Sequence, residues 1–169
     1  MDGLARLFDV GTCFAPVDLS TAGATGKRLS IKGASATAVM VSLAAAASGT
    51  ETVTLTLKEH TASSAGTTQD LAVIDHYWIK AEATLDNDEA WTKVTQTAAA
   101  TVALTGATYA TQEALVIIPV NTASVSDGYT HISLDASDPG TVARLASAQY
   151  LPHDLLVQRA PEMLASLLG

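Results

Sequence analysis

Alternation of apolar and polar residues, with a period of two, is the feature that most constrains how this chain folds. Between Thr52 and Leu57 every second residue is threonine, and valine or leucine stands between them. This period places the apolar side chains on one face of a β-strand, whereas an amphipathic helix needs a period of about 3.6. The pattern predicts half-buried strands at residues 29–33, 37–43, 51–58, 71–82, 90–97, 101–105, 114–120, 129–135 and 142–150.

Turn-forming residues separate these predicted strands at short intervals. Ser-Gly, Asp-Gly and Pro-Gly pairs supply backbone conformations that a strand interior lacks. No helical pattern of a dozen residues lies between them, so we expect an all-β fold, an antiparallel β-sandwich or jelly roll. The 31 alanines favour helix, but they alternate with valine, serine and the 22 threonines, and threonine favours strand.

The two ends of the chain do not follow this pattern. We expect residues 1–26 to form an N-terminal arm, residues 27–151 the sandwich, and residues 152–169 a C-terminal extension. Pro161 suits the first position of a short helix, which would need a packing partner to be stable. Each end carries an apolar cluster that either folds back on the sandwich or contacts another protein. The predicted interface residues are Leu4, Leu7, Phe8, Leu155, Leu156, Met163, Leu164, Leu167 and Leu168.

Composition argues against several classes of function. The net charge is −8 and the basic residues are scattered apart from Lys27-Arg28, so we expect no nucleic-acid partner, which would need clustered cations. Cys13 is the only cysteine, which excludes an intrachain disulfide and a cysteine zinc site. The first residues lack a secretory signal pattern and no apolar run is long enough to span a bilayer, so we expect a soluble protein made in a cytoplasm.

The histidines do not have the spacing of a catalytic or metal-binding motif. His76 shares a predicted strand face with Trp78 and Lys80, and we expect it at the surface or in an interface. His131 lies opposite the more apolar face that contains Ile132, so we expect it also to face solvent or an interface. No nucleophile motif accompanies either residue, and no two histidines have metal-ligand spacing.

Two further stretches resemble ligand sites but lack the required neighbours. Residues 86–89 read Asp-Asn-Asp-Glu, yet Trp91 follows closely where an EF-hand loop would continue, so we expect a charged turn. Residues 21–27 are followed by Arg28 instead of the Ser or Thr that ends a phosphate-binding loop. We expect Trp78 and Trp91 in core or interface packing. The sequence therefore predicts no enzyme activity, no cofactor and no metal.

The C-terminal half carries a pattern of strands and turns in a defined order. An apolar strand at 114–120 precedes an acidic Asp-Gly turn and an aromatic residue, and two further strands end at Tyr150. This order resembles the small decoration, or cement, proteins of tailed-bacteriophage heads, and the resemblance covers residues 28–151. The matching positions are Leu115, Val116, Val120, Asp127, Gly128, Tyr129, Ile132, Leu134 and Tyr150.

The resemblance implies a β-sandwich that assembles, commonly as a trimer, on the outside of a phage capsid and stabilises the junctions between capsomers. Its partners would be the major capsid protein and further copies of itself, with no nucleic acid and no membrane. Its location would be the outer surface of the virion, after synthesis in the cytoplasm of a host bacterium. On this interpretation we expect the C-terminal segment to form the contact between subunits and the N-terminal arm to contact the shell.

Other classes of function compete with this interpretation. A phage tail-tube or head–tail connector subunit is also a small β-sandwich, but it would form six-fold rings or tubes. A carbohydrate-binding jelly-roll module would keep exposed aromatic side chains on one face, and aromatic residues make up only 5% of this chain. An enzyme is the least favoured alternative, because no catalytic motif is present.

Overall fold

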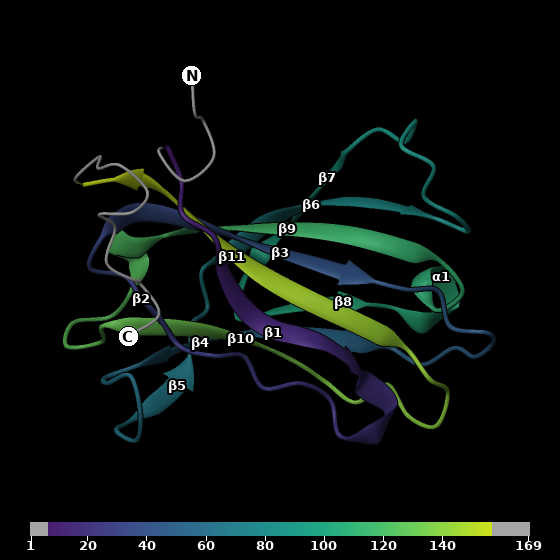
Figure 1. Cartoon of the computed structure of the whole chain (residues 1–169), viewed down its shortest axis with the longest axis horizontal. Helices are drawn as coiled ribbons and strands as arrows, with labels where there is room; N and C mark the ends of the chain where they lie inside the picture. The colour runs from purple at the N-terminus through teal and green to yellow at the C-terminus, as the bar shows by residue number, and fades with distance from the viewer. Residues whose placement is uncertain (1–6, 157–169) are drawn as a thin grey trace.

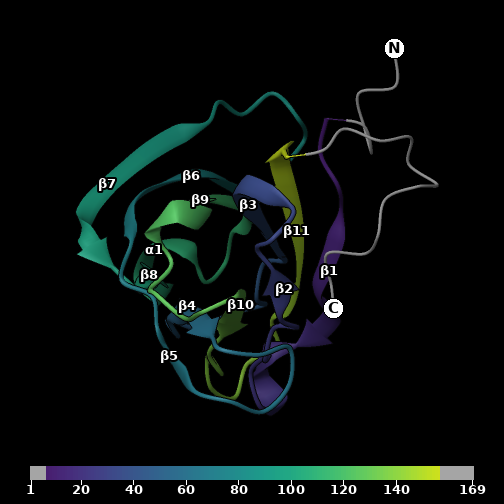
Figure 2. The ribbon, with the colours of Figure 1, turned by 90° about the vertical axis from the view of Figure 1, so that its left-hand side faces the viewer.

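The computed structural model describes residues 7–156, which fold into two antiparallel β-sheets around one core (Figure 1). The predicted all-β sandwich is confirmed. In sheet order, the six-stranded sheet consists of β1 (Gly11–Asp18), β11 (Leu145–Leu155), β3 (Ala34–Leu43), β9 (Glu113–Asn121), β6 (Ile74–Glu82) and β7 (Thr92–Ala99). Seen from one end in Figure 2, this sheet arches over the smaller sheet from β7 to β1.

The second sheet has five strands and closes the other side of the core. It consists of β2 (Leu29–Ser30), β10 (His131–Ala136), β4 (Val53–His60) and β5 (Thr68–Asp70), with β8 (Thr101–Leu104) paired to the first half of β4. Three helical turns lie in the connections: η1 (Leu19–Thr21), α1 (Gly106–Tyr109) and η2 (Thr122–Ser124). Val39 and Val116 from the first sheet, together with Leu57 and Leu134 from the second, are completely buried. The apolar half of each alternation therefore forms the core.

Each of the nine predicted strands overlaps an observed one, but their limits differ. The strand predicted from residue 71 begins at Ile74, because Leu71 and Val73 belong to a turn. In that turn the Leu71 amide donates to the Leu57 carbonyl at 3.0 Å, and the Val73 amide donates to the Leu71 carbonyl at 3.0 Å. The short strand β5 falls where the sequence indicates only a loop.

The N-terminal region differs from the expected arm. Residues 11–18 form β1, which pairs with β11 at the edge of the six-stranded sheet. Cys13 and Phe14 enter the core, and Leu19 follows them there. The proline of β1, Pro16, is exposed, which an edge strand tolerates because proline has no amide hydrogen to donate. The sandwich therefore begins well before residue 27.

The C-terminal limit of the sandwich also differs from the expected one. Strand β11 continues past Tyr150 to Leu155 and pairs with β3 throughout, so the first residues of the expected extension belong to the sheet. The helix predicted to start at Pro161 lies outside the described residues.

Candidate interaction surface

Part of the outer face of the six-stranded sheet is apolar, although an antiparallel sheet that faces water is usually polar on its outer side. Met40 of β3 pairs with Ile117 of β9, and Ile117 pairs with Trp78 of β6. These side chains point away from the core, because their strand neighbours Val39 and Ile118 are completely buried. We call this surface the apolar face; its partly exposed members are Ala36, Ala38, Met40, Trp78, Leu115, Ile117, Pro119 and Leu151.

Two tryptophans and two lysines alternate at the β6–β7 side of the apolar face. Trp78 pairs with Lys93 across the hairpin, and the register places Lys80 opposite Trp91. The Lys93 Nζ atom lies 5.8 Å from the centroid of the Trp78 ring, and the Lys80 Nζ atom lies 5.3 Å from that of Trp91. Trp78 is 37% exposed and Trp91 is 39% exposed, so the core alternative for these residues is wrong. Both rings remain accessible to a partner.

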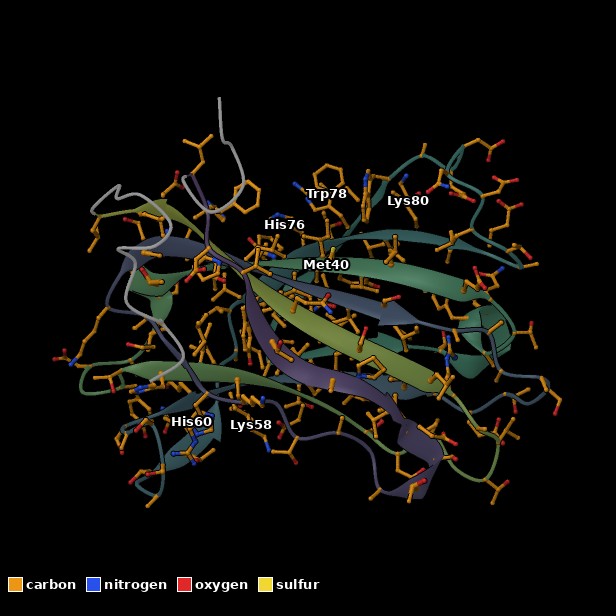
Figure 3. All side chains as sticks on the ribbon, viewed as in Figure 1. Met40, Lys58, His60, His76, Trp78 and Lys80 are labelled. Atoms are coloured by element: carbon orange, nitrogen blue, oxygen red, sulfur yellow. The ribbon has the colours of Figure 1, made fainter. Side chains whose placement is uncertain are left out.

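His76 lies at the surface, as the sequence predicts, and belongs to the same side of the molecule. Figure 3 shows His76, Trp78 and Lys80 along β6 above the sheet, with Met40 nearby. The His76 Nδ1 atom lies 2.5 Å from an oxygen of the exposed Asp75 carboxylate. The hydrogen bond with His76 lowers the pKa of Asp75. The pair is a local surface contact, with no nucleophile beside it.

A groove of about 280 Å³ opens on the apolar face toward the end of β11. Ala36, Val73 and Pro119 supply apolar lining, and His76 and His153 supply ring nitrogens. Its lining is therefore mixed rather than purely apolar. A groove of this size suits one or two side chains of a partner better than a drug-sized molecule, since typical ligand pockets are about 300–1,000 Å³.

The two ends of the described chain lie side by side next to this groove. Phe8 forms an isolated antiparallel bridge with His153, which itself lines the groove. Around this bridge Leu7 is 52% exposed, Val10 is 48% exposed and Leu156 is 67% exposed. The sequence places Leu7 and Leu156 in two separate clusters, and the structure brings them to one place at the margin of the apolar face.

The predicted interface residues fall into two groups. Leu7, Phe8, Leu155 and Leu156 lie within the described residues, and Leu155 is half-buried opposite Ala34 of β3. The other five, namely Leu4, Met163, Leu164, Leu167 and Leu168, lie outside the described residues. The sequence did not single out the apolar face itself, although the apolar residues at every position of Val116–Val120 were a signal that both faces of β9 need cover.

The outer face of the five-stranded sheet is polar. Along β4, the side chains of Thr54, Thr56, Lys58 and His60 alternate with core residues. The Lys58 Nζ atom lies 2.8 Å from an oxygen of the Asp135 carboxylate on β10, which raises the pKa of Lys58. This face satisfies its polar groups by cross-strand pairs.

His60 is the centre of a hydrogen-bonded cluster on that face. Its ring nitrogens lie 2.8 Å from the Ser133 Oγ atom and 2.8 Å from the Thr68 Oγ1 atom. Arg28 adjoins the cluster, because it donates to the Thr68 Oγ1 atom at 3.4 Å and to the Ala62 carbonyl at 2.8 Å. The Ser133–His60 distance would suit a nucleophile and its base, but these residues are only 1% and 4% exposed, so no substrate reaches them. The cluster is structural, and the sequence did not single out His60.

His131 is buried, which corrects the expectation that it faces solvent or an interface. It is 9% exposed and lies opposite His60 in the register of β10 and β4. Strand β10 is an interior strand between β2 and β4, and Ser133 on the same side of it is buried as well. Burial lowers the pKa of both histidines, with further contributions from Arg28 to both and from Lys32 to His131.

Three carboxylates gather at the β6–β7 turn. Oxygens of Glu82, Asp88 and Glu89 lie within 4.8 Å of one another, and within residues 7–156 this is the one group of three or more such ligands. The Asp86 amide donates to a Glu89 carboxylate oxygen at 2.7 Å, which occupies one of these oxygens within the turn. Calcium takes six to eight oxygen ligands, so one oxygen from each of the three carboxylates gives at most half of a shell.

Cys13 and Tyr150 link strands inside the core. The Cys13 thiol donates to the Leu134 carbonyl at 3.3 Å, and burial raises its pKa to about 11. The Tyr150 hydroxyl donates to the Lys27 carbonyl at 2.8 Å and accepts from the Leu134 amide at 3.2 Å. A thiol that stays protonated at neutral pH is a poor nucleophile, so these contacts hold β1, β10 and β11 together.

No protein-family model, no curated protein and no solved structure matches this chain. Within residues 7–156, no helix has the length and apolar character needed to cross a membrane.

Proposed function

We propose that this chain is a structural protein that binds the outside of a tailed-phage capsid and stabilises it, as a trimer at capsomer junctions. The proposal is supported by the resemblance of residues 28–151 to phage decoration proteins. The observation that carries it is the apolar face, together with the exposed Leu7, Val10 and Leu156 at its margin. Large exposed apolar surfaces mark sites of interaction with other proteins.

The energetics of such a surface suit an assembly. Full burial of one large apolar side chain contributes about 1.5–3 kcal/mol, so a few residues per contact give a modest affinity. A trimer would present three copies of the surface to the shell at once, and this multivalency strengthens the whole attachment without new contacts. A structural role needs no catalytic group, and the Ser133–His60 pair is closed to solvent.

The direct test is decoration of capsids that lack the protein. Purified protein is expected to be a trimer by light scattering and to cosediment with bare capsids of its phage. The capsids are expected to assemble without it but to lose resistance to heat and osmotic shock. Six-fold rings or tubes in solution would instead support the tail-tube or connector alternative. Normal particle stability without the protein would contradict the cement role.

A carbohydrate-binding module is a second candidate because Trp78 and Trp91 lie exposed on the same sheet face. Flat aromatic side chains stack on sugar rings, and two neighbouring platforms suit an oligosaccharide. A glycan array separates the two functions. Binding that is lost in both Trp78→Ala and Trp91→Ala would favour the module, whereas the capsid-binding function predicts no glycan signal.

A further inference from the structure

We propose that residues 61–70, which follow β4 and include β5, form a latch that opens when His60 takes up a proton, while the rest of the sandwich stays folded. We call these residues the latch segment. The segment belongs to the five-stranded sheet and not to the apolar face, so the latch does not depend on capsid binding. It is closed over the edge of β4 at neutral pH and opens at mildly acidic pH.

Polar contacts alone hold the latch segment in place. None of the side chains of residues 61–70 is buried, and those from residue 63 onward are exposed. The segment pairs with β4 only between Lys58 and His60, where Thr68 lies opposite His60. Burial of apolar side chains, the main source of stability in the core, therefore contributes little to its attachment. Segments with few buried contacts open at a low cost in free energy, without global unfolding.

The contacts of the latch segment converge on two side chains from other parts of the chain. The Thr68 Oγ1 atom lies 2.8 Å from the His60 Nδ1 atom and accepts from the Arg28 Nη2 atom at 3.4 Å. The Arg28 Nη1 atom also donates to the Ala62 carbonyl at 2.8 Å and to the Ala65 carbonyl at 2.5 Å. One arginine and one histidine thus hold both the loop and the strand of the latch segment.

Protonation of His60 changes what its ring can do in this arrangement. A neutral imidazole donates from one nitrogen and accepts at the other, so the hydroxyls of Thr68 and Ser133 satisfy it. An imidazolium donates from both nitrogens, and the Thr68 oxygen then accepts from two cations, His60 and Arg28. These cations repel each other, and His60 is only 4% exposed, so water screens the repulsion weakly. Release of the latch segment by Arg28 relieves the repulsion.

The charges around His60 favour the same direction. Burial lowers the pKa of His60 most, Arg28 lowers it further, and the Asp135 carboxylate offsets part of this. A ring that is exposed by opening returns to an ordinary pKa, so the closed state is favoured at neutral pH and loses this advantage as pH falls below about 6.5. The charged or titratable groups on the segments around His60 are Arg28, Lys58, Asp70, His131 and Asp135.

Hydrogen exchange of the full-length protein at pH 7.5 and 5.5, followed by mass spectrometry, tests the latch. After correction for the intrinsic exchange rate at each pH, exchange in residues 61–70 is expected to rise about three- to tenfold at pH 5.5. The upper limit follows because a ring with a pKa of about 6.5 gains at most about tenfold from protonation at that pH. Peptides from β9, an interior strand of the other sheet, are expected to keep their protection.

Two results of this measurement would overturn the proposal. The first is equal protection of residues 61–70 at both pH values. The second is an equal loss of protection in β9, because the whole sandwich would then be unfolding and no latch would be needed to explain the exchange.

A substitution at His60 identifies the group that takes up the proton. His60→Gln has no titratable ring, so exchange in residues 61–70 is expected to be independent of pH, whatever its level. A merely structural role would change that level and leave the pH dependence in place. His76→Gln is the matched control, since His76 lies at the surface of the other sheet, and it is expected to keep the wild-type rise. A wild-type rise in His60→Gln would overturn the proposal.

The wild-type chain gives a second readout that needs no substitution. In an NMR titration, the amide signals of Gly66 and Thr68 are expected to change with the same midpoint as the ring signals of His60. Amide signals that stay constant, or that change with a different midpoint, would show that the proton on His60 does not open the latch segment.

Discussion

The outer faces of the two sheets differ in how they meet their surroundings. On the six-stranded sheet, Met40, Ile117 and Trp78 present apolar surface that the described chain leaves partly exposed. On the five-stranded sheet, Lys58 and His60 lie on the opposite side of the molecule and bond to neighbouring strands (Figure 3). The polar face pairs its polar groups within the chain, whereas the apolar face stays partly exposed. One face therefore stabilises the fold, and the other leaves apolar surface open to contact.

The largest expected effect tests the structural role of the polar face. His60→Ala leaves the buried Ser133 hydroxyl and the exposed Thr68 hydroxyl without their shared partner, and it leaves a cavity where the buried ring was. One buried polar group that loses its partner costs about 1–3 kcal/mol and the cavity adds to this, so we expect the free energy of unfolding to fall by about 2–4 kcal/mol. Urea unfolding measures this loss. His76→Ala, on the other sheet, is the control, and an equal effect of the two changes would remove the distinction between the faces.

The second prediction concerns pH and sharpens the same contrast. The pKa values of His60 and His131 lie below the ordinary 6.5, mainly because both rings are buried. Arg28 and Lys58 lower the pKa of His60 further, and the Asp135 carboxylate partly offsets them. Lys32 and Arg28 lower the pKa of His131 further. The unfolded chain therefore binds more protons than the folded chain as pH falls through about 6.5 and below.

The contribution of the two histidines to the free energy of unfolding is therefore expected to be complete above that pH and to decline as pH falls toward 5.5. The decline is expected to be smaller than the loss in His60→Ala, because the ring stays packed. Unfolding between pH 7.5 and 5.5 measures the decline, and His131→Gln is expected to reduce it. Hydrogen bonds lower the pKa values of Asp18 and Glu59. These two carboxylates therefore begin to take up protons only at pH values below this range. A flat stability profile between pH 7.5 and 5.5 would show that the buried histidines do not govern this face.

A smaller effect is expected on the apolar side. Trp91→Ala removes the contact between the indole and the Lys80 ammonium, which at an exposed site is worth about 0.5–1 kcal/mol. Thermal unfolding of the variant is expected to show a loss of that size, and Thr97→Ala on the same edge strand is the control. A loss of several kcal/mol would mean that the tryptophan supports the fold and is not kept free for a partner.

The smallest effect is expected at the acidic turn that adjoins the apolar face. Because one oxygen from each of Glu82, Asp88 and Glu89 gives at most half of a calcium shell, a chelator is expected to change the free energy of unfolding by less than about 1 kcal/mol. Melting curves with and without EDTA, followed by added calcium, measure this. A large loss that calcium restores would show that the turn binds the ion and that metal helps to organise this side.

The sequence by itself determined which side of most strands enters the core. Alternation in residues 52–57 correctly predicts that Val53, Leu55 and Leu57 are buried, and Ile132 with Leu134 follows the same rule. This succeeds because the two-residue repeat is a property of the strand backbone and needs no knowledge of the neighbouring strand.

Only the tertiary structure decided which strands lie in the interior and what covers their outer sides. The sequence missed β1, whose partner β11 is more than a hundred residues away, and it misplaced His131, which is buried opposite His60 of the distant strand β4. It also separated Phe8 from His153, which the fold joins in one bridge at the margin of the apolar face. Period and composition are local, whereas burial of an outer face depends on long-range contacts that a local pattern does not encode.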